Sequence, residues 1–219
     1  MSAAAPRSKV VVFISGSGSN MMALANACQE QDFPAEIACV ISDKATAGGL
    51  AKAQTLGIPT LVFERKTYAS KAEHEQSILA ALSEIAPDII CLAGYMRLIS
   101  GDFIAPYAGR IINIHPSLLP LFPGLHTHER AIESGMKITG CTVHFVTEGM
   151  DEGPVIGQAA VPVLVDDTAD TLAARVLTVE HQLYPLALRL LAEGKVRMEG
   201  GKTVGKYLNP SSGKSLISA

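Results

Sequence analysis

Short apolar runs alternate with amphipathic stretches along this chain, a pattern typical of α/β proteins. The run 9–14 is short, apolar and rich in β-branched residues, as a strand covered on both faces is, and the runs 35–42 and 88–93 also predict strands. Further strands are predicted at 60–63, 110–114, 137–147 and 155–163. Helical spacing of apolar residues predicts helices at 21–30, 48–56, 70–86, 127–134 and 168–193. We therefore expect an α/β fold with a mostly parallel, doubly wound, Rossmann-like sheet and an antiparallel addition in the C-terminal half.

The rest of the chain predicts irregular segments and two loose ends. Residues 94–107 mix helix and turn signals, and the pair Gly200-Gly201 predicts a hairpin turn. Residues 1–8 are expected to form a flexible leader, and residues 206–219 a mobile tail. A single domain is predicted over 9–205, because neither a linker nor an internal repeat interrupts it.

Composition narrows the possible functions. The 219 residues carry a formal net charge of −3 and few aromatic side chains, which argues against a nucleic acid as partner. No apolar run approaches the ~18 residues that a membrane span requires, and no signal peptide is evident. The four cysteines lie in apolar surroundings outside any CxxC pair, which predicts buried thiols in a reducing compartment and no metal site. We expect a cytoplasmic protein.

The first candidate for binding is the loop SGSGSN at 15–20, between the first predicted strand and helix. Gly16 and Gly18 let the backbone approach an anion, which the N–H groups at the helix start then bind. Met21 stands where a dinucleotide fingerprint has its third glycine, and the lysine of a P-loop is missing, so a lone phosphate fits better than a pyrophosphate. The alternative is a plain turn in which Asn20 caps the helix.

The second candidate is the end of the strand 110–114 and the proline-rich segment after it. Asn113 and His115 alternate with isoleucines, so they project from one face of an extended chain. Asn113 offers amide N–H donors, and His115 offers a ring that titrates near neutral pH. Prolines and a glycine then predict a rigid loop, which is how α/β enzymes commonly present catalytic groups. The alternative is that each side chain only satisfies neighbouring backbone groups.

An acidic loop between the last two predicted strands offers a partner for this histidine. Residues 147–154 contain two glycines and a proline, and either Asp151 or Glu152 reaches His115 if the loop folds over the end of the sheet. A carboxylate beside a histidine favours the protonated ring, which can then donate a proton. The alternative is a solvated acidic loop without a catalytic role.

Four segments together resemble the glycinamide ribonucleotide formyltransferases, a family of folate-dependent enzymes of purine synthesis. They are ISGSGSN at 14–20, LAGYMRLIS at 92–100, NIHPSLLPLFPGLHTH at 113–128 and HFVTEGMDEGPVI at 144–156. The resemblance runs from about residue 9 to about residue 193. It implies the formyltransferase fold, with an N-terminal half that binds a phosphate or nucleotide and a C-terminal half that binds folate.

The resemblance also implies roles for individual residues. The catalytic residues of the family correspond to Asn113, His115 and Asp151. Its substrate-binding residues correspond to Gly18, Ser19, Asn20 and Glu180. Its folate pocket corresponds to Lys71, Met96, Arg97, Leu98, Ile99, Asn113, Thr147, Glu148, Gly149, Met150 and Asp151. Lys71 stands where the family usually has an arginine near the folate tail, and a point charge does not replace a bidentate fork equally.

The implied reaction is formyl transfer from 10-formyltetrahydrofolate to the amine of glycinamide ribonucleotide, without a metal. Asn113 and protonated His115 would stabilise the charge that develops on the formyl oxygen, while Asp151 keeps His115 charged and oriented. The expected partners are these two small molecules, with no nucleic acid and no membrane, and we expect a monomer or homodimer. Three alternatives are a methionyl-tRNA formyltransferase, which needs an added domain and a basic surface, a formyltetrahydrofolate hydrolase, and a non-catalytic phosphate sensor.

Overall fold

The computed structural model describes residues 6–205, so the predicted tail and most of the predicted leader lie outside the described residues. The chain divides into two compact units, of which the first ends at Asn113 and the second begins at Ile114. The boundary falls within strand β5 (Ile111–His115). The single domain expected over 9–205 stays a prediction.

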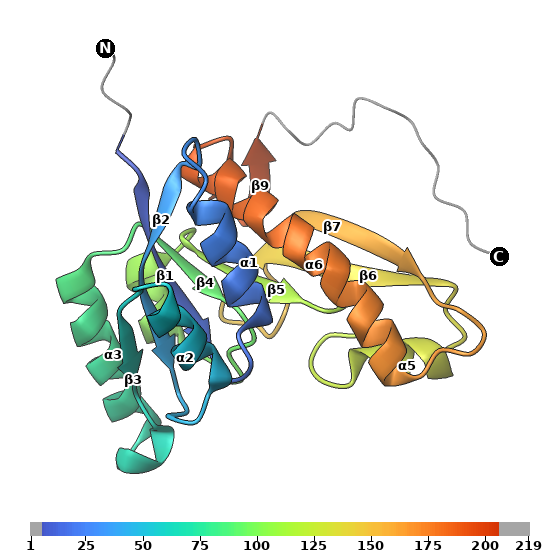
Figure 1. Cartoon of the computed structure of the whole chain (residues 1–219), viewed down its shortest axis with the longest axis horizontal. Helices are drawn as coiled ribbons and strands as arrows, with labels where there is room; N and C mark the ends of the chain where they lie inside the picture. Colours follow the sequence, from blue (N-terminus) through green and yellow to red (C-terminus); the bar gives the residue numbers. More distant parts are fainter. Residues whose placement is uncertain (1–5, 206–219) are drawn as a thin grey trace. The chain divides into compact units, whose positions relative to one another are not determined.

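Parallel strands form the sheet of the first unit (Figure 1). They are β1 (Ser8–Ile14), β2 (Ala35–Ser42), β3 (Thr60–Val62), β4 (Ile89–Leu92) and β5. They follow the order β3-β2-β1-β4-β5, so the direction in which strands are added reverses between β1 and β4. Every residue from Val10 to Ile14 is fully buried, which explains the uninterrupted apolar pattern of β1.

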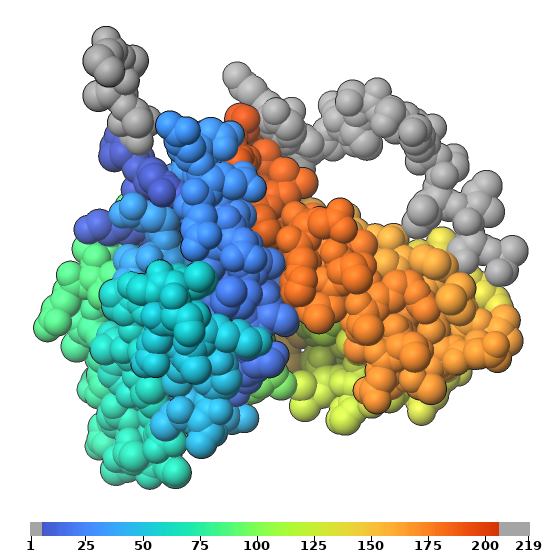
Figure 2. Space-filling view, viewed as in Figure 1, coloured from blue at the N-terminus to red at the C-terminus, as the bar shows by residue number. Residues whose placement is uncertain are grey.

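Helices cover both faces of this sheet. They are α1 (Ser19–Cys28), α2 (Gly48–Thr55), α3 (Lys71–Ile85) and the short α4 (Gly101–Ile104), with 3-10 turns η1 (Arg65–Thr67) and η2 (Ala105–Tyr107). Helix α1 packs against α2 and β2, and the two helices lie side by side in the space-filling view (Figure 2). The connection from β3 to β4 returns past β1, and right-handed crossovers therefore place α3 on the opposite face. The predicted doubly wound α/β fold is confirmed.

The second unit contains an antiparallel pair of strands, β6 (Ile138–Phe145) and β7 (Val155–Pro162), which confirms the predicted antiparallel addition. Helix α6 (Ala169–Ala192) packs against both strands and continues through Pro185. A capping box formed by Thr168 and Thr171 satisfies backbone groups at its start. The shorter elements are α5 (Thr127–Glu133) and a hairpin of β8 (Val196–Glu199) and β9 (Lys202–Gly205), which turns at the expected glycine pair.

All four cysteines are free and buried, as predicted. Burial raises the pKa of the Cys28 thiol to about 12, that of Cys39 to about 11 and that of Cys141 to about 12. Because the thiolate is the reactive form, these thiols are inert near neutral pH. Within residues 6–205, no helix is both long and apolar enough to cross a membrane, and no cluster of His, Cys, Asp or Glu side chains is suited to a metal ion.

Candidate functional site

The loop after β1 lines a cavity of about 340 Å³ in the first unit. Residues from the ends of β1, β2 and β4 surround it: 15–20, Lys44, Ala93, Gly94 and Met96. The strand order reverses between β1 and β4, and such a reversal is where ligands bind in open α/β sheets. The expected phosphate-binding residues Gly18, Ser19 and Asn20 all line this cavity.

Gly18 shapes the loop by having no side chain. It precedes α1 in the left-handed conformation, with a φ of 71°, which favours glycine. A Cβ at Gly18 would lie only 2.7 Å from the Cα of Gly49, at the start of α2. Two hydrogen bonds also hold the loop: the N–H of Gly49 donates to the carbonyl of Gly16 (3.1 Å), and Lys52 Nζ donates to the carbonyl of Ser17 (2.9 Å).

The alternative in which Asn20 caps the helix is wrong. Helix α1 begins at Ser19, and its N-cap is Gly18, which makes no side-chain hydrogen bond. Asn20 instead lies in the first turn and is buried. The first backbone N–H groups of α1 are therefore not occupied by a capping side chain, which is what an anion site at a helix start requires.

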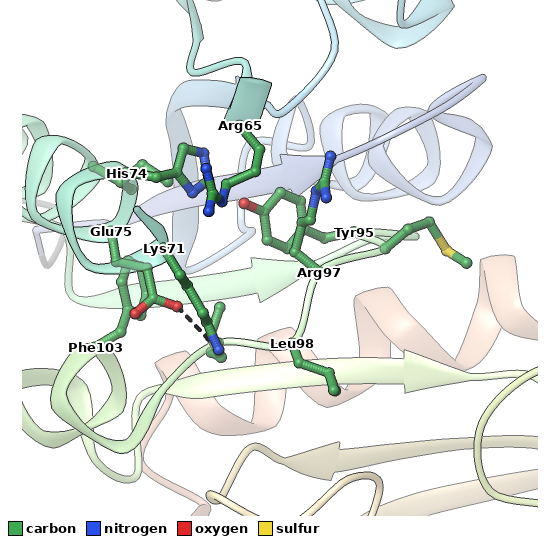
Figure 3. Close-up of a pocket in the computed structure, with 11 residues that line it drawn as sticks. Arg65, Lys71, His74, Glu75, Tyr95, Arg97, Leu98 and Phe103 are labelled. Carbon is green, nitrogen blue, oxygen red and sulfur yellow. Dashed lines mark ion pairs between the residues drawn. The ribbon is translucent and has the colours of Figure 1, made fainter. Parts of the chain in front are cut away.

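A second cavity of the first unit, of about 450 Å³, is lined by α3 and by the loop after β4 (Figure 3). It contains five of the expected folate-pocket residues: Lys71, Met96, Arg97, Leu98 and Ile99. Arg65, Lys71 and Arg97 bring cationic side chains to it from η1, α3 and the loop after β4. Its lining combines apolar side chains with positive charge, as suits a largely apolar ligand that carries carboxylates.

Glu75 partly balances the charge of Lys71 and anchors one wall of this larger cavity. Its carboxylate, which is mostly buried, lies 3.7 Å from Lys71 Nζ. It also accepts hydrogen bonds from the N–H (3.0 Å) and the hydroxyl of Ser100. The Ser100 hydroxyl accepts in turn from the N–H of Phe103 and caps α4. Ser100, which directly follows the segment 96–99, is therefore held in place.

In the second unit, the side chains of His115 and Asp151 come together. His115 Nδ1 lies 3.4 Å from Asp151 Oδ2, and the two side chains are only 7% and 13% exposed. The other ring nitrogen, Nε2, lies 2.9 Å from the carbonyl oxygen of Phe122. The ring of His115 therefore lies between a carboxylate and a backbone carbonyl oxygen, one beside each of its nitrogens. Of the two acidic candidates in the sequence, Asp151 is the one whose carboxylate lies beside His115.

The backbone of Asp151 is unusual for a residue with a side chain. Its φ is 55°, in the left-handed region that aspartate and asparagine tolerate better than most residues. Its Oδ2 also accepts a hydrogen bond from the N–H of Gly124 (2.8 Å), which ties the acidic loop to the proline-rich loop. Such strained conformations concentrate at functional sites, where surrounding contacts enforce them.

The proline-rich loop after β5 is fixed by strands β6 and β7. The hydroxyl of Thr142 donates to the carbonyl of Ser117 (2.7 Å) and accepts from the N–H of Leu119 (3.0 Å). From β7, Gln158 Nε2 donates to the carbonyl of Leu119 (2.8 Å). These bonds immobilise the loop that supplies the acceptor for His115, so the ring is oriented by the main chain as well as by a carboxylate.

A second histidine approaches the same carboxylate. His144 Nδ1 donates to the carbonyl of Phe145 (2.8 Å), and Nε2 lies 3.8 Å from Asp151 Oδ1. Burial lowers the pKa of His144, although the Phe145 carbonyl and the charge of Asp151 act in the opposite direction. Burial likewise lowers the pKa of His128 on α5. A neutral His144 leaves the charge of Asp151 to interact chiefly with His115.

The remaining residues of the expected folate-binding loop in the second unit are Thr147, Glu148, Gly149 and Met150. Met150 is half exposed, and its side chain lies against Gly124. Glu152, the other acidic candidate, folds over Gly149, where an added Cβ would collide with its carboxylate. The carboxylate of Glu152 therefore lies beside Gly149 of its own loop.

Asn113 and Glu180, two expected site residues, are not among the residues that line the two cavities described above. Asn113 closes the first unit on β5, paired with Leu92 of β4. Glu180 lies on α6 in the second unit and is 6% exposed, and its charge adds to burial in raising the pKa of Cys141. That Asn113 acts with His115 stays a prediction, and so does a contact of Glu180 with the substrate expected at residues 15–20, which are called the phosphate loop below.

Sequence reasoning missed four charged residues that line or support the cavities: Asp43, Lys44, Arg65 and Glu75. A signal existed for the first two, because Ser42-Asp43-Lys44 ends a predicted parallel strand, and the carboxyl ends of such strands meet at the ligand-binding edge. Arg65 and Glu75 gave no local signal, since charged side chains on helices are most often only solvated.

Known proteins similar to this chain agree on one family. The family model described as formyl transferase matches residues 8–188. The phosphoribosylglycinamide formyltransferase of Escherichia coli is 44% identical over 86% of this chain and 89% of its own length. The trifunctional purine biosynthetic protein adenosine-3 of Homo sapiens is 48% identical over 90% of this chain. The chain spans 20% of the length of that protein, and the same share of the chicken and bovine relatives of that name.

A solved structure resembles this chain over nearly its full length. The crystal structure of phosphoribosylglycinamide formyltransferase from Brucella melitensis is 62% identical, covers 97% of this chain and 100% of its own, and superposes with a TM-score of 0.85. The expected formyltransferase fold is thereby confirmed.

Proposed function

Because the chain belongs to the formyl transferase family, we propose that it transfers the formyl group of 10-formyltetrahydrofolate to the amine of glycinamide ribonucleotide. Both expected co-substrates are small molecules, and the reaction belongs to purine biosynthesis, as the names of the relatives indicate. The enzyme acts in the cytoplasm as a monomer or homodimer, without a metal, a nucleic acid or a membrane as partner.

The pair of His115 and Asp151 is the observation that carries this proposal. The substrate amine attacks the formyl carbon, and negative charge develops on the formyl oxygen. Protonated His115 and the amide N–H of Asn113 stabilise that oxygen, as the donors of an oxyanion hole do. When the bond from the formyl carbon to N10 breaks, His115 helps to pass a proton to N10, while the attacking amine loses one. Asp151 keeps His115 charged and oriented.

The two cavities of the first unit supply the binding. The backbone N–H groups at Gly18, Ser19 and Asn20 hold the phosphate of the ribonucleotide in the smaller cavity, which is lined by these residues. Glu180 contacts the same substrate. The larger cavity and the loop 147–151 hold the folate. Holding two reactants in fixed positions replaces a bimolecular encounter, which supplies much of the rate advantage without a covalent intermediate.

Turnover of purified protein tests the proposal. The protein is mixed with glycinamide ribonucleotide and 10-formyltetrahydrofolate, without added metal, and the release of tetrahydrofolate is measured. We expect release that depends on both substrates. Release from 10-formyltetrahydrofolate alone, with formate as product, would instead identify a hydrolase. Binding of inorganic phosphate without turnover at high protein concentration would favour the phosphate sensor.

A further inference from the structure

Asp43 connects the two cavities of the first unit, although it lines neither of them. It follows β2 directly, and its side chain is 1% exposed. One carboxylate oxygen, Oδ1, accepts a hydrogen bond from the hydroxyl of Ser15 (2.6 Å), the first residue of the phosphate loop. The other oxygen, Oδ2, accepts from Nε of Arg97 (2.7 Å), which lines the larger cavity. A single buried carboxylate thus bonds to a residue of each cavity.

Ser15 extends this connection through its own hydroxyl. While donating to Asp43, the hydroxyl accepts a hydrogen bond from the N–H of Met96 (2.9 Å). The N–H of Ser15 in turn donates to the carbonyl of Gly94 (3.1 Å). Met96 lines both cavities. The phosphate loop and the segment that begins at Met96 are therefore joined by a continuous chain of hydrogen bonds.

The bond to Asp43 fixes the direction of the Arg97 side chain. An arginine on an exposed loop otherwise samples many rotamers, and ordering it costs conformational entropy on binding. Here Nε is held by a buried carboxylate, while the side chain as a whole stays 44% exposed beside the larger cavity. Arg97 and Tyr95 both reach the cavity from the loop after β4 in Figure 3. Arg97 therefore lines the larger cavity with a side chain that is already held at Nε before a ligand enters.

We propose that Asp43 is a positioning residue, which orients Arg97 for the folate co-substrate and couples the folate cavity to the phosphate loop. This inference rests on the proposed function. It assigns to Asp43 no contact with either substrate, because its carboxylate is buried and both of its oxygens are already bonded. Occupation of the phosphate loop acts on the folate cavity through Ser15, since the two ligands share one hydrogen-bonded element.

The first experiment measures the steady-state constants of Asp43→Asn. Asparagine keeps the size and an oxygen acceptor but removes the charge that holds Arg97. We expect KM for 10-formyltetrahydrofolate to rise about tenfold, with kcat within about twofold and a smaller change in KM for glycinamide ribonucleotide. Asp167→Asn is the matched control, since it also breaks a carboxylate–arginine pair, with Arg175, but lies in the second unit. An unchanged folate KM in Asp43→Asn would overturn the positioning role.

A double-mutant cycle shows whether Asp43 acts through Arg97. The variants are Asp43→Asn, Arg97→Gln and the two combined. If the only effect of Asp43 on folate binding is to orient Arg97, the double variant has the same folate KM as Arg97→Gln alone. Additive losses would contradict this route. If Arg97→Gln or the double variant fails to give a cooperative thermal unfolding transition, Arg97→Lys takes the place of Arg97→Gln in the cycle. Lysine keeps the positive charge beside Asp43 but lacks the Nε donor of arginine.

Ser15→Ala tests the coupling between the cavities. The folate probe is tetrahydrofolate, and its Kd is measured with and without saturating glycinamide ribonucleotide. We expect the ribonucleotide to tighten binding about fivefold or more in the unmodified protein, and not in Ser15→Ala. If the ribonucleotide tightens folate binding equally in both proteins, or in neither, the two cavities are not coupled through Ser15.

Absence of turnover in the unmodified protein would end the proposed function, whereas turnover with unaltered Asp43→Asn constants ends only this inference.

Discussion

The loop after β1 and the loops around His115 build a site in opposite ways. The first depends on the backbone and on glycines without a side chain. Gly18 takes a left-handed conformation and lies so close to Gly49 that no side chain fits. The second depends on two side chains from separate stretches, those of His115 and Asp151, and a backbone carbonyl only orients the ring. Backbone donors suit an anion whose charge does not change, whereas a proton carrier needs a titratable ring with fixed neighbours.

This difference predicts different consequences of mutation. Damage to the loop after β1 should weaken substrate binding and leave the chemical step nearly intact. Damage around His115 should slow the chemical step and leave binding nearly intact, because these groups act mainly on charge that develops in the transition state. Steady-state constants separate the two.

The largest effect is expected for His115→Ala. Loss of the proton donor and of its positive charge should lower kcat by at least the ~10²-fold typical of an acid–base group, with little change in KM for either substrate. The matched control is His126→Asn, because His126 is an exposed histidine with a φ of 58°, a conformation that asparagine tolerates. An unchanged kcat in His115→Ala would remove this residue from the mechanism.

A smaller loss of kcat, about tenfold, is expected for Asp151→Asn. Asparagine tolerates the left-handed backbone and still accepts the hydrogen bond from Gly124, but it no longer holds a charged ring at His115. The dependence of kcat on pH should change in shape, since protonated His115 loses its carboxylate partner. If the pH profile of kcat keeps the shape that it has in the unmodified protein, whether or not kcat itself is lower, Asp151 does not set the charge of His115.

Gly18→Ala tests the first region, where we expect KM for glycinamide ribonucleotide to rise about tenfold while kcat stays within about twofold. The reason is steric, since the added Cβ collides with Gly49 and pushes the loop away from its phosphate-binding position. Gly57→Ala is the matched control: Gly57 has the same φ of 71°, but an added Cβ there has nothing within 4 Å. Gly57→Ala should lose about 1 kcal/mol of stability because alanine is strained at this φ, and Gly18→Ala should lose more because the collision adds to that strain. A similar KM in both would contradict the steric explanation.

The smallest effect concerns stability and pH. Burial lowers the pKa of His144 in the folded protein, so below the unfolded value the unfolded chain binds more protons than the folded one. The free energy of unfolding should therefore fall as the pH drops from about 7 to about 5, around the ~6.5 of an unperturbed histidine. His144→Gln should flatten this slope in chemical denaturation series. An equal or steeper slope would mean that Asp151 outweighs burial at this ring.

The sequence predicted most elements of the fold because the core strands are apolar along most of their length. The runs at 9–14 and 88–93 have few alternatives to buried parallel strands, and the glycine pair marked the last hairpin correctly. The pattern predicts the start of α1 at Met21, two residues after the observed start at Ser19. Ser19 and Asn20 are also turn residues, and the N-cap, Gly18, makes no side-chain hydrogen bond. Local signals are weakest where the backbone alone forms the cap.

The sites were predictable to the extent that their residues stand close in the sequence. The SGSGSN loop and the pair Asn113 and His115 are contiguous patterns with a physical meaning of their own. The acid could be narrowed only to Asp151 or Glu152, because loop geometry decides which one faces His115. The position of Asp43 at the end of a predicted strand was a signal for the ligand-binding edge, but its partners, Ser15 and Arg97, are far away in sequence, so the sequence could not predict the buried ion pair.

The four buried thiols make this protein convenient to observe. Cys28, Cys39, Cys91 and Cys141 are at most 7% exposed, so maleimide reagents should leave them untouched in the folded protein. A cysteine introduced at an exposed position near either loop would then carry a fluorophore or spin label alone, in an otherwise native background. With one such label in each unit, a change in the distance between the two labels on ligand addition could be measured.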